Sequence, residues 1–341
     1  MQEERRKTSP HTKRRQEKIN RTRYTLAPDS FISIMSWFKR KHKNDMFKYD
    51  DEEEYNQKQI GGVGGIVIDD AHSHSHSLPT DLPGVTTKQL RTVFWLNLVA
   101  FAFQAASAAG IILLIDNEKK YAFYTNYPIV SEEGGIPIGP NAKVAFSLNI
   151  GWFTGVFLAL SALDHLLVCT IFKRSYEKGL SGHYNIFRWI EYALSASLMR
   201  VVVGVLSGVN DLHTIFLQFG LTATTMLFGL VFELENRELR LSGNVRWYIY
   251  WLGFIPHFFS WAVVLGYFFY SLSVGGNPPL FVYFIIGVIF VLDLSFAVVL
   301  GLQWQGKKCF RPYVNGEIAF IILSFTSKNL LAWINFFGGN R

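Results

Sequence analysis

The stretch "IAFIILSFTSKNLLAWINFF", residues 318–337, has the length and composition of a helix that spans a membrane. At about 1.5 Å per residue, a helix of this length covers the roughly 30 Å of a bilayer's hydrocarbon core. Lys328 is the only charged residue in the stretch and falls near its middle. An ammonium group at that depth costs about 3 kcal/mol, so Lys328 is a candidate functional residue.

Six further apolar blocks of similar length precede this stretch. A bilayer requires the backbone of each spanning segment to form its hydrogen bonds internally, which favours helices. The blocks lack the polar face that a helix of a soluble all-α protein presents to water. The sequence therefore predicts an all-α membrane protein whose residues 88–341 form a bundle of seven transmembrane helices. The predicted spans are Val93–Ile115, Leu148–Phe172, Trp189–Val209, Leu212–Phe232, Trp247–Leu272, Leu280–Leu302 and Ile318–Phe337.

Residues 1–87 contain 28 of the chain's 59 charged side chains and no long apolar run. Basic residues dominate 1–48 and acidic residues dominate 49–87, a composition that predicts a disordered, charged cytoplasmic tail. The basic half could also contact anionic lipids. The "HSHSHS" run at 72–77 is interpreted as low-complexity sequence. Met35 is an alternative start to Met1.

The basic residues between the spans predict the orientation of the chain. They gather in alternate loops, and basic loops stay on the cytoplasmic side. The N-terminus is therefore expected in the cytoplasm and the C-terminus outside. Residues 116–147 lie on the expected outer side. Their side-chain character alternates along "YAFYTNYPIV", and the glycines and prolines of "GGIPIGPN" follow, which predicts a short extracellular β-hairpin. The basic residues of the inner loops are Lys173, Arg174, Lys178, Arg188, Arg237, Arg240, Arg246, Lys307, Lys308 and Arg311.

No sequence pattern indicates an enzyme, a metal site or a nucleic-acid partner. There is no phosphate-binding glycine loop, and the residues show no spacing typical of a protease triad. Cys169 and Cys309 both fall on the expected cytoplasmic side, where a disulfide is not favoured.

Ionisable residues inside the predicted spans are functional candidates because burying them in lipid is costly. For Lys328 the residues alone leave two alternatives. One is an ion pair with a buried carboxylate. The other is a Schiff base, because an apolar pocket lets a lysine amine react with an aldehyde. The remaining candidates are Asp164, His165, Glu191, Arg200, His257 and Asp293.

Several motifs together resemble the heliorhodopsins, retinal proteins with an inverted membrane orientation. The motifs are "LSFTSKNLLAW" at 323–333, "FRWIEYALSASLM" at 187–199, "LSALDHLL" at 160–167, "FGLTATTMLFGLVFELEN" at 219–236 and "NGEIAFIILSFTSK" at 315–328. The resemblance covers all seven spans, about residues 88–341. It does not cover the tail.

The resemblance implies that Lys328 binds all-trans retinal as a protonated Schiff base and that Glu191 is its counterion. Side chains lean toward the N-terminus of their helix, so the Lys328 amine should lie at a depth close to that of Glu191. Ser195 shares the face of Glu191, and Ser324 shares that of Lys328. Candidate pocket walls are Met226, Phe258, Trp261 and Trp333. The hairpin is expected to support a homodimer.

The resemblance also implies a polar, water-containing cytoplasmic cavity around His165, to which Glu317 would belong. A histidine that is only satisfied by a neighbouring hydroxyl is the alternative. Where related proteins carry a second histidine on the first helix, this chain has Gln104. Asp164 and Asp293 are additional acids, both expected in the cytoplasmic half with Glu191. Arg200 lies on the opposite face of its helix and is expected to make an interhelical or dimer contact.

Two classes of function follow, both in a multi-pass protein of the lipid bilayer. In the first, the protein is a photoreceptor that signals to an unknown partner by a conformational change. In the second, Asp164 and Asp293 relay protons for a light-driven or light-gated transporter. A regulator of another membrane protein is a third alternative.

Overall fold

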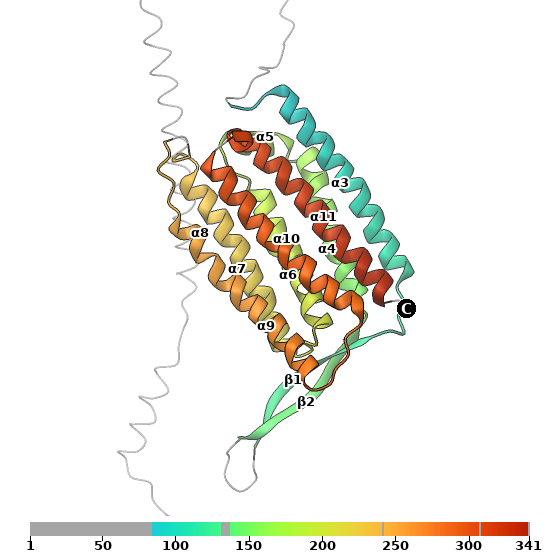
Figure 1. Cartoon of the computed structure of the whole chain (residues 1–341). Helices are drawn as coiled ribbons and strands as arrows, with labels where there is room; N and C mark the ends of the chain where they lie inside the picture. Colours follow the sequence, from blue (N-terminus) through green and yellow to red (C-terminus); the bar gives the residue numbers. More distant parts are fainter. Residues whose placement is uncertain (1–83, 131–136, 241, 307, 340–341) are drawn as a thin grey trace, which may run out of the picture. The chain divides into compact units, whose positions relative to one another are not determined.

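The computed structural model describes residues 84–130, 137–240, 242–306 and 308–339 (Figure 1). This part of the chain contains seven helices long and apolar enough to cross a membrane. They confirm the predicted all-α class and the seven spans. Most of the charged tail, with Met35 and the 72–77 run, lies outside the described residues, so the expectations for it stay predictions.

The seven helices follow the chain around a closed bundle (Figure 1). Each long helix packs against the next along the chain, except that α9 and α10 make little contact with each other. The last helix, α11, returns to pack against α3 and α4 and closes the bundle. The helices are α3 (Thr87–Leu114), α4 (Gly151–Cys169), α6 (Ile186–Leu206), α7 (Leu212–Asn236), α9 (Phe254–Ser273), α10 (Leu280–Gln305) and α11 (Tyr313–Gly339).

Three of the helices that extend beyond their predicted spans at one end of the bundle carry buried charges in the added turns. Helix α6 begins at Ile186, α7 ends at Asn236 and α11 begins at Tyr313. Their extra turns hold Arg188, which the sequence analysis placed in a loop, and Glu233 and Glu317. A hydropathy boundary falls where charges begin, but these helices continue because the charges are paired in the interior.

Short helices and a 3-10 turn connect some of the spans. Helix α5 (Lys173–Ser181) lies between α4 and α6, and η1 (Lys308–Phe310) precedes α11. Gly253 separates helix α8 (Tyr248–Leu252) from α9, so the predicted span from Trp247 to Leu272 consists of two helical segments. We call the end of the bundle that carries α5 the α5 end (Figure 1).

A β-hairpin connects α3 and α4, as predicted. Strands β1 (Tyr121–Val130) and β2 (Pro137–Leu148) pair in antiparallel fashion, with Tyr121 opposite Leu148. The hairpin extends from the end of the bundle opposite α5, which we call the hairpin end (Figure 1).

The hairpin is attached to the start of α7. The backbone N–H of Tyr124 donates to the carbonyl of Asn210 at 2.8 Å, and the Asn126 amide donates to Asp211 Oδ1 at 2.8 Å. Asp211 is also the N-cap of α7, because its carboxylate accepts from the Thr214 backbone N–H. Burial raises the pKa of the Asp211 carboxyl, but these hydrogen bonds outweigh it and lower that pKa below its usual value.

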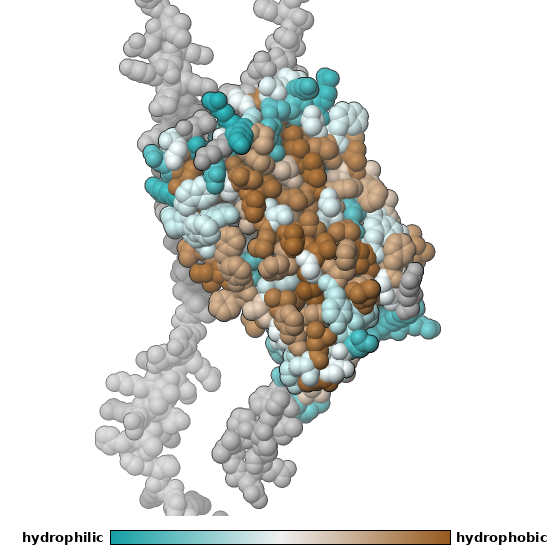
Figure 2. All heavy atoms as spheres, viewed as in Figure 1, coloured by the Kyte–Doolittle hydropathy of each residue, from teal (hydrophilic) through white to brown (hydrophobic). Residues whose placement is uncertain are grey.

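The outside of the bundle is apolar. Large side chains such as Phe216, 75% exposed, and Leu280, 84% exposed, point away from the bundle. Figure 2 shows a continuous hydrophobic surface across the middle of the face in view, with hydrophilic residues gathered toward the ends. Exposed apolar area of this extent requires a lipid solvent. The chain is therefore a multi-pass integral membrane protein.

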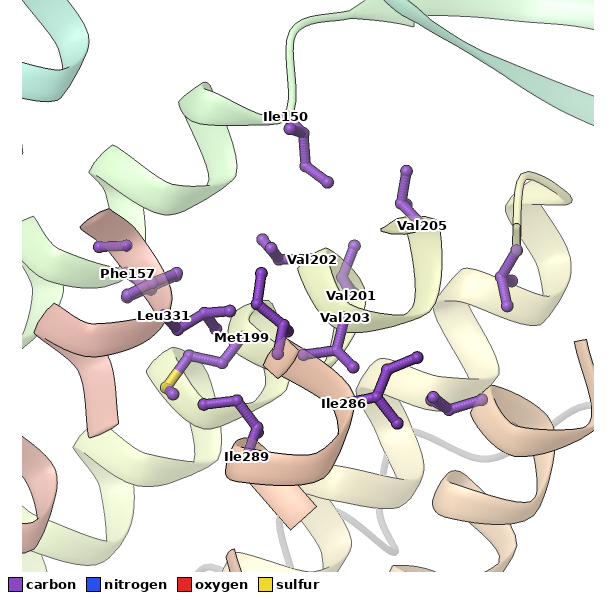
Figure 3. Close-up of a cluster of buried hydrophobic side chains, with 14 of the residues drawn as sticks. Ile150, Phe157, Met199, Val201, Val202, Val203, Val205, Ile286, Ile289 and Leu331 are labelled. Carbon is purple, nitrogen blue, oxygen red and sulfur yellow. The ribbon is translucent and has the colours of Figure 1, made fainter. Parts of the chain in front are cut away.

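The half of the bundle nearer the hairpin has a close-packed apolar core. Phe157 from α4, Val202 from α6 and Leu331 from α11 are all fully buried. Figure 3 shows these side chains directed into one cluster with Met199 and Ile289.

Candidate functional site

Helix α11 carries Lys328 into the interior of the bundle, where it is 2% exposed. Its amine donates to Glu191 Oε1 at 2.6 Å and to Ser161 Oγ at 2.9 Å. The amine also lies 5.0 Å from the centre of the Tyr192 ring. An amine held in this way has a fixed position and a charge partner, which offsets the cost of its burial.

Three helices build this lysine site. Glu191 projects from α6, Ser161 from α4 and Lys328 from α11. The structure brings Lys328 and Glu191 together at the matching depth that their helix positions predicted. The serine in contact with the amine is Ser161, whereas Ser195 and Ser324, although buried, make no hydrogen bond to it.

A large apolar cavity extends from Lys328 between α6, α7, α9 and α10. Its volume is about 1040 Å³, including its open mouth. Gly229 lets the Trp189 ring lie directly against α7 in the wall of the cavity, because a side chain at that position would collide with the ring. Its walls are mostly apolar with a few polar points, a composition typical of a site for an apolar ligand. The lining residues include Trp189, Tyr192, Met199, Arg200, Thr222, Thr225, Met226, Phe228, Phe232, Tyr250, Phe254, His257, Ile289, Asp293, Phe296, Ser327 and Lys328.

A second ionic cluster lies between the lysine site and the α5 end. The Arg188 guanidinium forms ion pairs with both Glu233 and Glu317, and all three side chains are buried. The Tyr313 hydroxyl donates to Glu233 Oε2 at 3.1 Å, and the Asn185 amide donates to Glu317 Oε1 at 2.8 Å. Burying such a cluster is tolerated only because its members are paired and hydrogen-bonded.

A path of polar side chains leads from this cluster toward the lysine site. Tyr176, from α5, donates to Glu317 Oε1 at 3.0 Å, and Asn97 Nδ2 lies 3.5 Å from the Tyr176 hydroxyl. Burial, together with the Glu317 carboxylate, raises the pKa of Tyr176 well above its usual value, so its hydroxyl stays protonated. Asn97 Oδ1 contacts His165 Nδ1 at 2.6 Å.

His165 stands one helical turn from Ser161 on the same face of α4. Polar side chains therefore continue from Lys328 almost to the α5 end. Sequence reasoning missed Asn97, Tyr176 and Arg188 as members of this path. The four-residue spacing of Ser161 and His165 was the signal available for the α4 part of it.

Several predicted cavity residues lie elsewhere. Gln104 is buried, but Asn97, two turns away on α3, is the first-helix residue that contacts His165. Asp293 was grouped with the acids near Glu191. The structure instead pairs it with Arg200, because α10 places the carboxylate beside that guanidinium. This contact between α6 and α10 confirms the interhelical role expected for Arg200. Asp164 lies next to His165 on α4 and is partly exposed.

Of the four residues predicted to line the ligand pocket, the methionine lines the cavity and the three aromatic residues do not. Met226 does line the cavity. Trp261 is buried, but its ring covers the Arg200 guanidinium at 3.9 Å and is not among the lining residues. Trp333 stacks on Phe337 near the hairpin end, and Phe258 faces outward. Hydropathy and helical periodicity do not distinguish a wall from a lipid-facing ring when aromatics are this common.

On the hairpin side of Lys328 the polar path stops. The next polar contact is the bond from the Asn335 amide to Thr154 Oγ1 at 3.0 Å. Each of these residues lies seven positions, about two turns, from a member of the lysine site on its own helix. Phe157, Leu158 and Leu331 fill the interval and are completely buried.

A family model described as Heliorhodopsin matches residues 93–339, which is most of the chain and includes all of this site. The chain belongs to the heliorhodopsin family. No curated protein matches it. Heliorhodopsins are retinal-binding, light-sensing membrane proteins, and the family is generally non-enzymatic. The family implies a retinal chromophore, and the buried amine at the wall of an apolar cavity fits that group.

Proposed function

We propose that this heliorhodopsin is a photoreceptor that binds all-trans retinal through Lys328 as a protonated Schiff base and signals by a conformational change. The buried contact of the Lys328 amine with Glu191 at 2.6 Å carries the proposal. It holds the nitrogen beside a carboxylate and at the wall of an apolar cavity. Retinal, when bound, supplies the absorption of visible light and an isomerisation that displaces its surroundings.

In this proposal, the residues of the chain hold and move a proton on one side only. Glu191 compensates the positive charge at the Lys328 nitrogen, and Ser161 fixes its orientation. A proton that leaves the nitrogen can pass along the polar path to His165, whose imidazole can accept it and is held in place by Asn97. The apolar layer of Phe157, Leu158 and Leu331 separates the nitrogen from the hairpin end, which disfavours net transport.

The proposed orientation places the N-terminus and the α5 end in the cytoplasm and the hairpin and C-terminus outside. The excess of basic residues in the α5-end loops supports it. We also propose that the hairpin takes part in a homodimer and that a signalling partner binds at the cytoplasmic side, where the polar path ends. A light-driven or light-gated proton transporter is the second candidate, because Asp164 lies next to His165 and is partly exposed.

Photocurrents of the full chain under voltage clamp distinguish the two functions. Under continuous light, a photoreceptor gives a brief charge movement that decays to zero. A sustained proton current that falls in Asp164→Asn would contradict the photoreceptor proposal and favour the transporter. A sustained proton current that falls in Asp293→Asn instead would assign the relay to that acid, although its carboxylate is paired with Arg200.

Glu191→Gln tests the proposed counterion. Removing the carboxylate charge beside the nitrogen destabilises the protonated form of the pigment. The protonated band should therefore be lost at a lower pH than in the unchanged protein, and it should shift to the red. An unchanged spectrum and pH profile would assign the counterion role to another acid, with Asp164 the next candidate.

A further inference from the structure

The apolar cavity beside Lys328 has one strongly polar region. Arg200 on α6 is 4% exposed and forms an ion pair with Asp293 on α10. His257 on α9 is 9% exposed, and all three residues line the cavity. Most of the other lining residues are aromatic or aliphatic.

Part of this polar region has no protein partner. Asp293 engages only Arg200 Nη2, so the Nε and Nη1 groups remain without a hydrogen bond to any described residue. The same holds for His257 Nε2. The Trp261 ring lies 3.9 Å from the guanidinium carbon, and such ring stacking covers a face of the group and leaves its N–H edge available. Buried polar groups are almost always satisfied, so these groups indicate a hydrogen-bonding partner within the cavity.

The partner has to be compatible with a ligand attached at Lys328. Formation of a Schiff base joins the lysine nitrogen to the aldehyde carbon and releases the aldehyde oxygen as water. The polyene chain of a retinoid is hydrocarbon. The ring is therefore the part of such a ligand that can present an oxygen to Arg200 and His257, which come from helices other than the lysine-bearing α11.

We infer that the cavity is selective for a retinoid whose ring carries an oxygen acceptor, a hydroxyl or a keto group. Arg200 and His257 are the specificity-determining residues, and Asp293 positions the guanidinium. The inference rests on the proposed function and names its ligand class. A plain hydrocarbon ring leaves the buried N–H groups unpaired, and a site built to bond an oxygen discriminates against the ligand that lacks it.

Retinoid alcohols test the inference without the covalent step, because they cannot form a Schiff base. We would titrate the full chain with retinol and with 3-hydroxy- and 4-keto-retinol, following the quenching of tryptophan fluorescence. The ring-oxygenated alcohols should bind about 10- to 100-fold more tightly than retinol. The ratio of the two affinities within one protein sample is insensitive to partial misfolding.

Two variants should reduce that ratio to near one. His257→Phe removes one polar group, and Arg200→Gln combined with Asp293→Asn removes the guanidinium without leaving an unpaired carboxylate. The matched controls are His213→Phe at the hairpin end and Arg237→Gln combined with Glu238→Gln, an exposed ion pair. The controls should keep the full ratio. Thermal unfolding of each ligand-free variant shows whether it is folded.

The outcomes separate the inference from the proposed function. Equal affinities for retinol and its oxygenated forms, with a pigment still formed from retinal at Lys328, would overturn the selectivity and leave the photoreceptor in place. A ratio that persists in both cavity variants would also overturn it. Failure of every alcohol to bind, together with failure of every aldehyde to form a pigment, would contradict the proposed function itself.

Discussion

The two halves of the bundle bury different kinds of side chain in their interiors. From Lys328 toward the α5 end, the interior contains two groups of ion pairs and a path of amides, hydroxyls and a histidine. From Lys328 toward the hairpin end, the interior is mostly a close-packed apolar core of which Phe157 and Leu331 are part (Figure 3). The Arg200–Asp293 ion pair lies at the edge of this core, with Arg200 against the buried Trp261 ring. The same helices pass through both halves. The two halves therefore differ in the side chains that these helices direct into the interior on either side of Lys328.

This contrast has a mechanical consequence. A polar network can exchange one hydrogen-bond partner for another at modest cost, whereas a close-packed core resists displacement. Movement at Lys328 is therefore expected to displace residues toward the α5 end, whereas the close-packed apolar residues toward the hairpin end stay in place.

Lys328→Ala should abolish the pigment completely, since no other lysine of the described chain lies in the interior of the bundle. The change also leaves the buried Glu191 carboxylate without its cationic partner, so thermal unfolding of the variant has to show that it is folded. Absorption spectra after addition of retinal measure the effect. Lys173→Ala, at an exposed lysine of α5, should keep the full band. A visible band that survives in Lys328→Ala would remove the lysine from the mechanism.

Arg188→Gln should destabilise the protein by about 3–5 kcal/mol, because it leaves the buried carboxylates of Glu233 and Glu317 unpaired. Thermal unfolding in detergent or nanodiscs measures the loss. Arg237→Gln breaks an exposed ion pair with Glu238 and should cost less than about 1 kcal/mol. Adding Glu233→Gln to Arg188→Gln should recover part of the loss, and full additivity of the two changes would contradict a coupled cluster.

Phe157→Ala tests the apolar half. It removes a completely buried ring and should cost about 3 kcal/mol. Phe284→Ala, on a ring that is 55% exposed on the outside of α10, should cost much less. A proton current that appears only in the Phe157 variant would show directly that this layer is the barrier.

Asp211→Ala should have the smallest effect, a loss of about 1 kcal/mol from the N-cap of α7 together with looser attachment of the hairpin. Asp211→Asn keeps a good N-cap and should lose less. The pKa of Asp211 is lower in the folded protein than in the unfolded chain, so the ionised carboxylate stabilises the folded state at pH values above the unfolded-state pKa. That contribution is lost as the pH falls through the lower folded pKa. Thermal unfolding of the three proteins between pH 3 and 7 should show their difference narrowing only at the acidic end.

The sequence by itself determined the number and type of the spans, the hairpin and the lysine site. Hydropathy is sufficient for the spans, because a bilayer accepts few alternatives to a long apolar helix. The family resemblance implied the pairing of Lys328 with Glu191, and the lean of helical side chains placed the two residues at similar depths. The motifs around both residues identified the family before the structure did.

Only the tertiary structure decided which polar residues belong together. Arg188, Glu233 and Glu317 each stand at the edge of a hydropathy window, where a charge in water and a buried charge have the same appearance. Asp293 could not be assigned to Arg200 rather than to the lysine site, because the two helices' rotation and relative height are absent from a one-dimensional pattern. Whether a charge is buried depends on partners from other helices, and these are distant in sequence. The Arg188–Glu317 and Arg200–Asp293 pairs each join two helices that do not follow each other along the chain.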